Sequence, residues 1–329
     1  MRYFNFDLLI EQASDDSLVA RVLESPTGQA RSTFRSPFNP IELENLILKI
    51  GRSRRGNRSF DNIPTRAAKE LGGRLFGSVF ASEVGACLQS SIYYAESREG
   101  GLRIRLRLDA PGLADLPWEY LYNASLNSFL ALSAETSLVR YLDLARPMRP
   151  PLLSPPLKVL VLIASPTDYP QLAGEDEWKI LNSAMQPLSA AGQVHLERLE
   201  QPTLAALQAR LRRGSYHVLH FIGHGGFDDR AQDGLLILEN SHGRGDQVTS
   251  HRLAAILHNH PSLQLVVLNC CEGARLSVNE PFSGVAQSLI QQGVPAVIAM
   301  QFEISDDAAI TFGRVFYESL ADGLAVDAA

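Results

Sequence analysis

The second half of the chain alternates short apolar runs with stretches of helical spacing, and this alternation restricts the folds that it can adopt. Near-continuous apolar runs such as 158–165 and 263–270 are typical of strands buried on both faces. Strands separated by helices form parallel βαβ units. We therefore predict an α/β fold with a mostly parallel sheet covered by helices on both faces. The predicted strands are 158–165, 194–200, 216–223, 234–240, 263–270 and 295–300, and the predicted helices are 175–191, 203–213, 249–259, 282–292 and 305–322.

A proline-rich stretch at 144–158 predicts an extended linker, because proline is excluded from helix interiors. The predicted domains are 1–150 and 156–329. The first is a mixed α+β region that begins with two paired strands. Its other predicted elements are helices at 40–50 and 64–97, strands at 101–110, 129–133 and 137–142, and a short helix or turn at 116–123.

Composition narrows the function classes. The net charge of −6 argues against direct nucleic-acid binding, and the apolar runs are too short to cross a bilayer. The N-terminal sequence does not resemble a targeting peptide. Three cysteines form no disulfide framework, so we expect a reducing cytoplasm. We expect no cofactor and no membrane partner.

Two of the predicted strands end at residues that can perform nucleophilic catalysis. His224 follows the strand at 216–223, and Cys271 follows the strand at 263–270. A histidine can take the thiol proton, which leaves a nucleophilic thiolate. The backbone N–H groups of Gly225 and of Cys271 itself are the candidate oxyanion hole. Cys270 is expected to point to the opposite side of its strand, as a packed core residue.

Other interpretations of the same residues are weaker. His220 and His224 would lie about 13 Å apart along a strand, too far to share a metal ion. The glycines at 223–226 are followed by a turn and a strand, whereas a phosphate-binding loop opens directly into a helix. A single buried cysteine is usually inert. His224 and Cys271 at neighbouring strand ends are therefore interpreted as a catalytic pair.

The motifs HFIGHGGFD and VVLNCCEGAR, with the segment GVAQSLIQQGVPAVIAMQFEISDDAA, resemble the CHAT domain family of caspase-like clan CD cysteine peptidases. The resemblance implies a caspase-like sandwich at 156–329. It assigns His224 as the base and Cys271 as the nucleophile, since the family usually has alanine at the position of Cys270. It also implies an endopeptidase that cleaves one or a few protein partners, in bacterial signalling or antiphage defence.

Acidic residues near the expected cleft suggest what the enzyme recognises. Asp168 follows the first strand of the second domain, and Glu303 and Asp306 follow the strand at 295–300. A carboxylate there would pair with a basic residue of the substrate. Asp306 and Asp307 also suit a simple helix-capping role.

The resemblance also implies a final helix and strand that would follow Ala329, so the second domain is expected to lack its last two elements. We expect a protein substrate, together with a downstream effector region or a regulatory partner chain. The alternative function is a catalytically silent caspase-like scaffold that binds partners without cleaving them.

Overall fold

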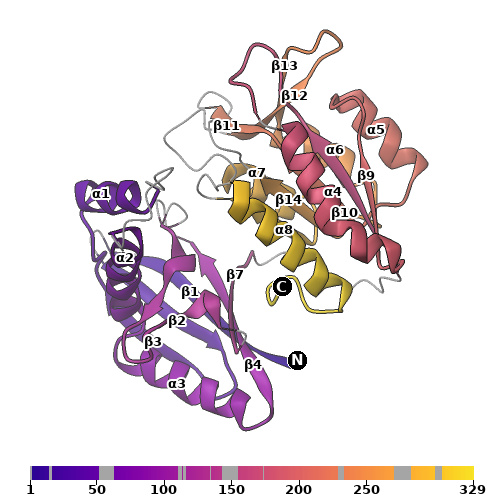
Figure 1. Ribbon diagram of the computed structural model, residues 1–329. Helices are drawn as coiled ribbons and strands as arrows, with labels where there is room; N and C mark the ends of the chain where they lie inside the picture. The colour runs from indigo at the N-terminus through magenta and orange to yellow at the C-terminus, as the bar shows by residue number, and fades with distance from the viewer. Residues whose placement is uncertain are drawn as a thin grey trace. The chain divides into compact units, whose positions relative to one another are not determined.

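A computed structural model describes residues 2–14, 17–51, 63–109, 113, 116–133, 135–142, 155–172, 174–228, 233–269, 283–300 and 306–329. The chain divides into two compact units, Met1–Asp143 and Leu144–Asp327 (Figure 1). Most of the proline-rich stretch at 144–158 lies outside the described residues. The boundaries 1–150 and 156–329 therefore stay a proposal.

The described part of the first unit contains a five-stranded mixed sheet with the order β3-β2-β1-β4-β7. Its strands are β1 (Arg2–Ser14), β2 (Ser17–Glu24), β3 (Ala30–Phe34), β4 (Gly100–Leu108) and β7 (Thr136–Arg140). The antiparallel pairing of β1 with β2 confirms the predicted strand pair. On β4, Leu102, Ile104 and Leu106 are buried, as the alternation at 101–110 predicts.

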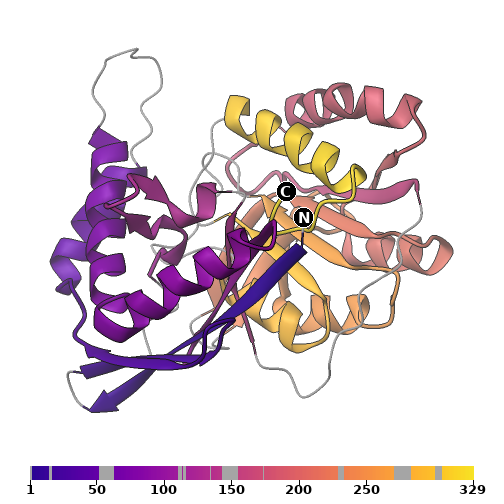
Figure 2. The ribbon, with the colours of Figure 1, turned by 90° about the horizontal axis from the view of Figure 1, so that it is seen from below.

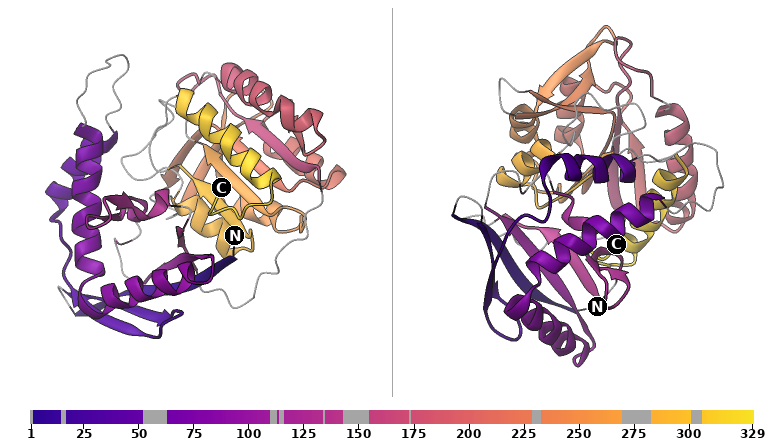
Figure 3. Two further views of the ribbon diagram at one scale, coloured as in Figure 1. Left: turned by 60° about the horizontal axis from the view of Figure 1, so that its bottom comes forward. Right: turned by 90° about the vertical axis from the view of Figure 1, so that its left-hand side faces the viewer.

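Helices pack against that buried face of the sheet (Figure 3). They are α2 (Ile63–Val79) and α3 (Ser82–Glu96), whereas α1 (Pro40–Gly51) packs against α2. The single helix predicted at 64–97 is wrong, because the chain turns after Phe80 and Ser82 adopts a positive φ of 48°. Gly85 permits this turn, since a Cβ there would collide with the Phe80 carbonyl.

The segment after β4 is shorter and less regular. It contains η1 (Trp118–Tyr120), β5 (Tyr122–Asn123), β6 (Ser128–Phe129) and η2 (Leu130–Leu132). The strand predicted at 129–133 is therefore mostly a 3₁₀ turn. Leu130 is buried but Leu132 is 81% exposed. An extended strand here would be poorly stabilised, because strands are stabilised by packing of their side chains and only Leu130 is packed in the core.

The second unit is built on a parallel sheet with the order β15-β14-β10-β8-β9. Its strands are β8 (Leu157–Ile163), β9 (Val194–Arg198), β10 (Val218–Ile222), β14 (Leu265–Asn269) and β15 (Ala296–Ala299). All four pairings are parallel, which confirms the predicted sheet.

Helices cover both faces of this sheet, as predicted. They are α4 (Gly174–Ala190), α5 (Leu204–Arg213), α6 (Ser250–Leu257), α7 (Ser283–Gln291) and α8 (Asp306–Ala321). Val159 and Val161 face a core shared with α4 and α8, which lie side by side in Figure 2. Leu160 and Leu162 face a second core, shared with α5, α6 and α7. None of the helices within the described ranges is long and apolar enough to cross a membrane.

A second, antiparallel sheet lies beyond the end of β10 (Figure 1, top). It consists of β11 (His224–Asp228), β12 (Asp233–Glu239) and β13 (Gly245–Thr249). The strand predicted at 234–240 thus exists but does not belong to the helix-connected alternation. The physical reason is length, since antiparallel neighbours need only a short turn, whereas a parallel crossover needs a dozen or more residues.

A buried polar pair connects the central strand to α8. Nδ1 of His220 lies 2.8 Å from the hydroxyl of Tyr317, and burial lowers the pKa of His220 to about 4. His220 is therefore a neutral core histidine. Its Nε2 has no hydrogen-bond partner within the described residues. The pair places two polar groups inside an otherwise apolar core.

We expect this histidine to make folding stability depend on pH. Its folded-state pKa is about 4 and its ordinary value is 6.5, so between these pH values the unfolded chain binds a proton that the folded chain excludes. Stability should fall as the pH is lowered through this window, by about 3 kcal/mol from this group.

Denaturant unfolding of the wild type and of His220→Asn, measured between pH 7 and pH 4, tests this expectation. Asparagine keeps a polar partner for Tyr317 but does not titrate. The wild type should lose more stability on acidification than the variant. Equal losses in the two proteins would contradict the assignment.

Candidate functional site

The register of the parallel sheet brings three strand ends to one edge. Ile222, the last residue of β10, lies opposite Ile163 of β8 and Asn269 of β14. Side chains that follow these three residues therefore gather at the carboxyl edge, where parallel α/β sheets place their functional groups. Both neighbours of β10 end level with it, so the edge forms a common platform.

His224 lies at this edge, two residues beyond Ile222. Its side chain is fully buried. His224 follows β10, and it is also the first residue of β11, where it pairs with Ile237 of β12. Gly223 forms the joint between the two strands, and its N–H donates to the carbonyl of Asn269 at 3.3 Å. The histidine is thus held by both sheets.

A backbone carbonyl determines which nitrogen of His224 carries the proton. Nε2 lies 2.8 Å from the carbonyl oxygen of Pro170. That oxygen can only accept, so Nε2 must donate, and the neutral ring then carries its lone pair on Nδ1. Nδ1 is buried and has no hydrogen-bond partner within the described residues. The ring of Tyr169 lies 5.5 Å away, centroid to centroid.

The remaining predicted catalytic groups are only partly described. Gly225 is buried in β11 opposite Leu236, directly after the histidine. Cys271 lies outside the described residues. In the sequence it is two residues beyond Asn269, just as His224 is two residues beyond Ile222. The pairing of His224 with Cys271 and the oxyanion hole at Gly225 and Cys271 stay predictions.

Of the three acids predicted to bind substrate, the structure describes the side chain of Asp168 alone. Glu303 lies outside the described residues. Asp306 is the first residue of α8, and its side chain is not described. Asp168 lies in the loop at 165–172, where its Oδ1 accepts from the N–H of Gly245 at 2.7 Å. Its substrate role therefore also stays a prediction.

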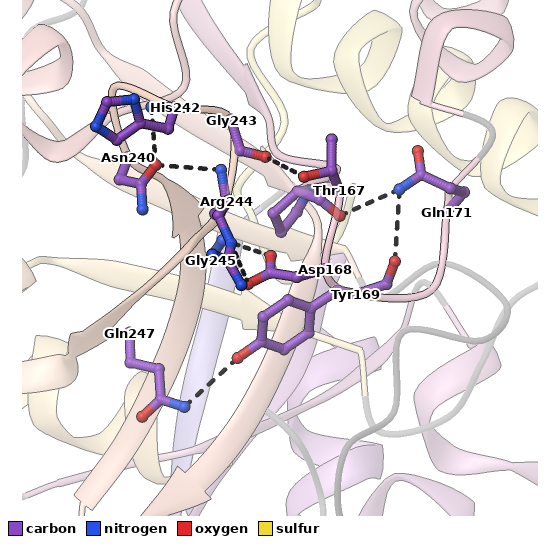
Figure 4. Close-up of polar contacts among 11 residues, drawn as sticks. Thr167, Asp168, Tyr169, Gln171, Asn240, His242, Gly243, Arg244, Gly245 and Gln247 are labelled. Atoms are coloured by element: carbon purple, nitrogen blue, oxygen red, sulfur yellow. Dashed lines mark hydrogen bonds and ion pairs between the residues drawn. The ribbon is translucent and has the colours of Figure 1, made fainter.

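Asp168 is charged in the folded protein. The hydrogen bond from the Gly245 N–H is the largest cause that lowers its pKa, and the nearby Arg244 guanidinium adds to the effect. Nε of Arg244 lies 3.6 Å from Oδ2. Figure 4 shows this carboxylate between the loop and the turn that connects β12 to β13.

The three histidines of this part of the chain contact different partners. Within the described ranges, no group of three histidine, cysteine, aspartate or glutamate side chains is arranged to hold a metal ion. His217, which the sequence places near the other two histidines, accepts a hydrogen bond from the Lys158 N–H at 3.1 Å. His220 faces α8 instead. Only His224 of the three lies at the carboxyl edge.

Sequence reasoning missed the partner of His224. The Pro170 carbonyl is a backbone group, and every residue has one, so no side-chain pattern distinguishes it. Tyr169 and Gly245 were missed for a related reason, because their role depends on a contact between the loop and a strand that was not predicted. A hairpin signal at 240–245 was available, since Asn240 and Gly243 are typical turn residues.

The fold and the edge histidine define a caspase-like α/β sandwich. A family model described as the CHAT domain matches residues 67–329. Since this match covers most of the chain, the protein belongs to the CHAT domain family. A comparison with curated proteins finds no match.

The described geometry predicts the tautomer of His224. In ¹⁵N-labelled protein, at a pH where the ring is neutral, Nε2 should carry the proton and Nδ1 should be bare, because the Pro170 carbonyl accepts only. Long-range ¹H–¹⁵N correlation spectra distinguish the two nitrogens. His224→Gln assigns the signals by removing them. A protonated Nδ1 with a bare Nε2 would contradict the geometry.

Proposed function

We propose that this CHAT domain protein is a cysteine endopeptidase that cleaves specific protein partners through Cys271 and His224. The observation that supports this proposal best is the buried His224 ring. Its Nε2 is bound to the Pro170 carbonyl, which leaves the Nδ1 lone pair available as a base. The position of Cys271 in the chain, just past the paired end of the neighbouring strand, supplies a matching nucleophile.

The chemistry balances with these two groups alone. Nδ1 of His224 takes the thiol proton of Cys271, and the thiolate attacks the carbonyl carbon of the scissile peptide bond. The N–H groups of Gly225 and Cys271 would stabilise the oxyanion. His224 then gives its proton to the leaving amine. A water molecule, deprotonated by His224, then attacks the thioester carbonyl carbon. The C–S bond breaks, the acid product leaves, and His224 returns its proton to the Cys271 thiolate.

We further propose the setting that the family resemblance implies. The substrate is a protein, and the pathway is bacterial signalling or antiphage defence, with a downstream effector region or a regulatory partner chain. The compartment is the reducing cytoplasm.

Alkylation rates test the catalytic pair. A peptidyl electrophile should label Cys271 in the wild type, and His224→Gln should slow this labelling by about 100-fold or more, because the thiol loses its base. Mass spectrometry of the digested protein identifies the labelled site. Cys270→Ala is the matched control and should be labelled at the wild-type rate. Labelling of Cys271 that does not depend on His224 would favour the silent scaffold.

A panel of fluorogenic peptides tests the specificity. Peptides that end in arginine or lysine should be cleaved faster than peptides that end in aspartate, because the carboxylates of Glu303 and Asp306 would pair with a basic residue. The ratio of kcat/KM between the two peptide classes is the measured quantity. Cys271→Ala should abolish cleavage of both. A preference for aspartate would contradict the assignment of these acids.

A further inference from the structure

We propose that Asp168 is a positioning residue, which holds the loop at 165–172 on the turn between β12 and β13 and thereby orients His224 through the Pro170 carbonyl. This inference rests on the proposed function for its catalytic meaning. Its structural part stands on the described contacts. It also gives Asp168 a different role from the substrate recognition that the sequence predicts.

The Pro170 carbonyl needs an external support. It belongs to a loop without helix or strand, between β8 and α4, yet it lies 2.8 Å from Nε2 of His224. Bonds inside the loop give it a compact form. The side-chain amide of Gln171 donates to the Pro166 carbonyl at 3.1 Å, and the Leu172 N–H donates to Oγ of Ser165 at 3.1 Å. Such internal bonds do not fix the loop relative to His224.

The external bonds lead to β12, β13 and the turn between them. The N–H of Ser165 donates to Oε1 of Glu239 at 3.0 Å. The N–H and hydroxyl of Thr167 both donate to the Gly243 carbonyl, at 2.9 and 3.1 Å. Asp168 accepts from the Gly245 N–H at 2.7 Å, the shortest of these bonds.

The turn is itself well ordered by its own hydrogen bonds, so it can serve as an anchor (Figure 4). The side-chain oxygen of Asn240 accepts from the N–H groups of His242 and Arg244, at 2.9 and 3.1 Å. The Asn240 N–H donates to the Arg244 carbonyl at 2.8 Å. Gly243 has a φ of 70°, which a glycine adopts without strain.

A second contact, from the start of β13, reaches the histidine through Tyr169. The Tyr169 ring packs over Gly245, where a Cβ would collide with it, and its hydroxyl accepts from the amide of Gln247 at 3.4 Å. The centroid of the same ring lies 5.5 Å from that of the His224 ring. Asp168 and Tyr169 therefore connect the start of β13 and the adjoining turn to one imidazole.

The contacts of Asp168 favour positioning over substrate recognition. Oδ1 faces the Gly245 N–H at the start of β13, and Oδ2 faces the Arg244 guanidinium of the turn. The Arg244 side chain is 68% exposed, and exposed ion pairs contribute little. The hydrogen bond to Gly245 is thus the contact that matters. Asparagine at position 168 would retain its acceptor oxygen, but alanine would not.

The test uses Asp168→Ala and Asp168→Asn in the full chain. Asp168→Ala should slow labelling of Cys271 by about 10- to 100-fold, in the maximal rate and not in the affinity for the reagent, because a misplaced base impairs the reaction more than binding. Asp168→Asn should rescue the rate to within about threefold of the wild type. Asp246→Ala, which removes the neighbouring carboxylate on β13, is the matched control and should leave the rate unchanged.

Two further measurements separate this inference from the proposed function. The ¹⁵N spectrum of His224 reports its tautomer without any activity, and Asp168→Ala should mix the two tautomers while Asp168→Asn keeps the Nε2-protonated form. Gly245→Ala leaves Asp168 in place but displaces the Tyr169 ring, and it should perturb the same signals even if Asp168→Ala fails to fold.

Three outcomes decide the matter. An unchanged His224 spectrum in both Asp168→Ala and Gly245→Ala overturns the positioning role. Loss of reactivity in Asp168→Asn toward basic reagents alone, with neutral reagents unaffected, also overturns it and assigns Asp168 to substrate recognition. If the His224 spectrum is perturbed in these variants but His224→Gln does not slow the labelling of Cys271, the positioning role is supported and the peptidase is rejected.

Discussion

The parallel pairing of β10 with both β8 and β14 is the constraint on which the rest of the second unit depends. Both edges of β10 are hydrogen bonded and both of its faces are covered by helices, so its register is fixed from four sides. If β10 slipped by one residue against its neighbours, the side chains that now face one core would face the other. The same register makes Ile222 and Asn269 end side by side, and everything at the carboxyl edge follows from this alignment.

The imidazole of His224 at this edge is oriented by a peptide carbonyl and not by a carboxylate. A carbonyl oxygen has no proton to gain or lose near neutral pH, so it accepts from Nε2 of His224 wherever the fold persists. It also brings no charge into a buried position, where an unpaired charge would be costly. The consequence is that the accuracy of the orientation depends on the backbone of a loop, and the loop depends on the β12–β13 turn.

Sequence patterns predicted the layers of the second unit because burial on both faces leaves a strong signal. The runs at 158–165 and 263–270 became β8 and β14, and His224 lies at the predicted edge. The features that the sequence patterns missed are short, or they depend on contacts of the backbone. The break at Phe80 depends on a glycine contact, and β11 and β13 are short strands whose residues carry little apolar alternation. The Pro170 contact leaves no trace in side-chain types at all.

The contacts that complete the site are far apart in the chain. His224 and Pro170 are separated by 54 positions, and Asp168 and Gly245 by 77. Contacts of such separation form late, because a long loop must close before they are gained. During synthesis, a chain that has emerged only as far as His224 has its imidazole but has neither β14 nor the turn that contacts the loop. The order of the residues thus delays assembly of the site until the whole sheet is available.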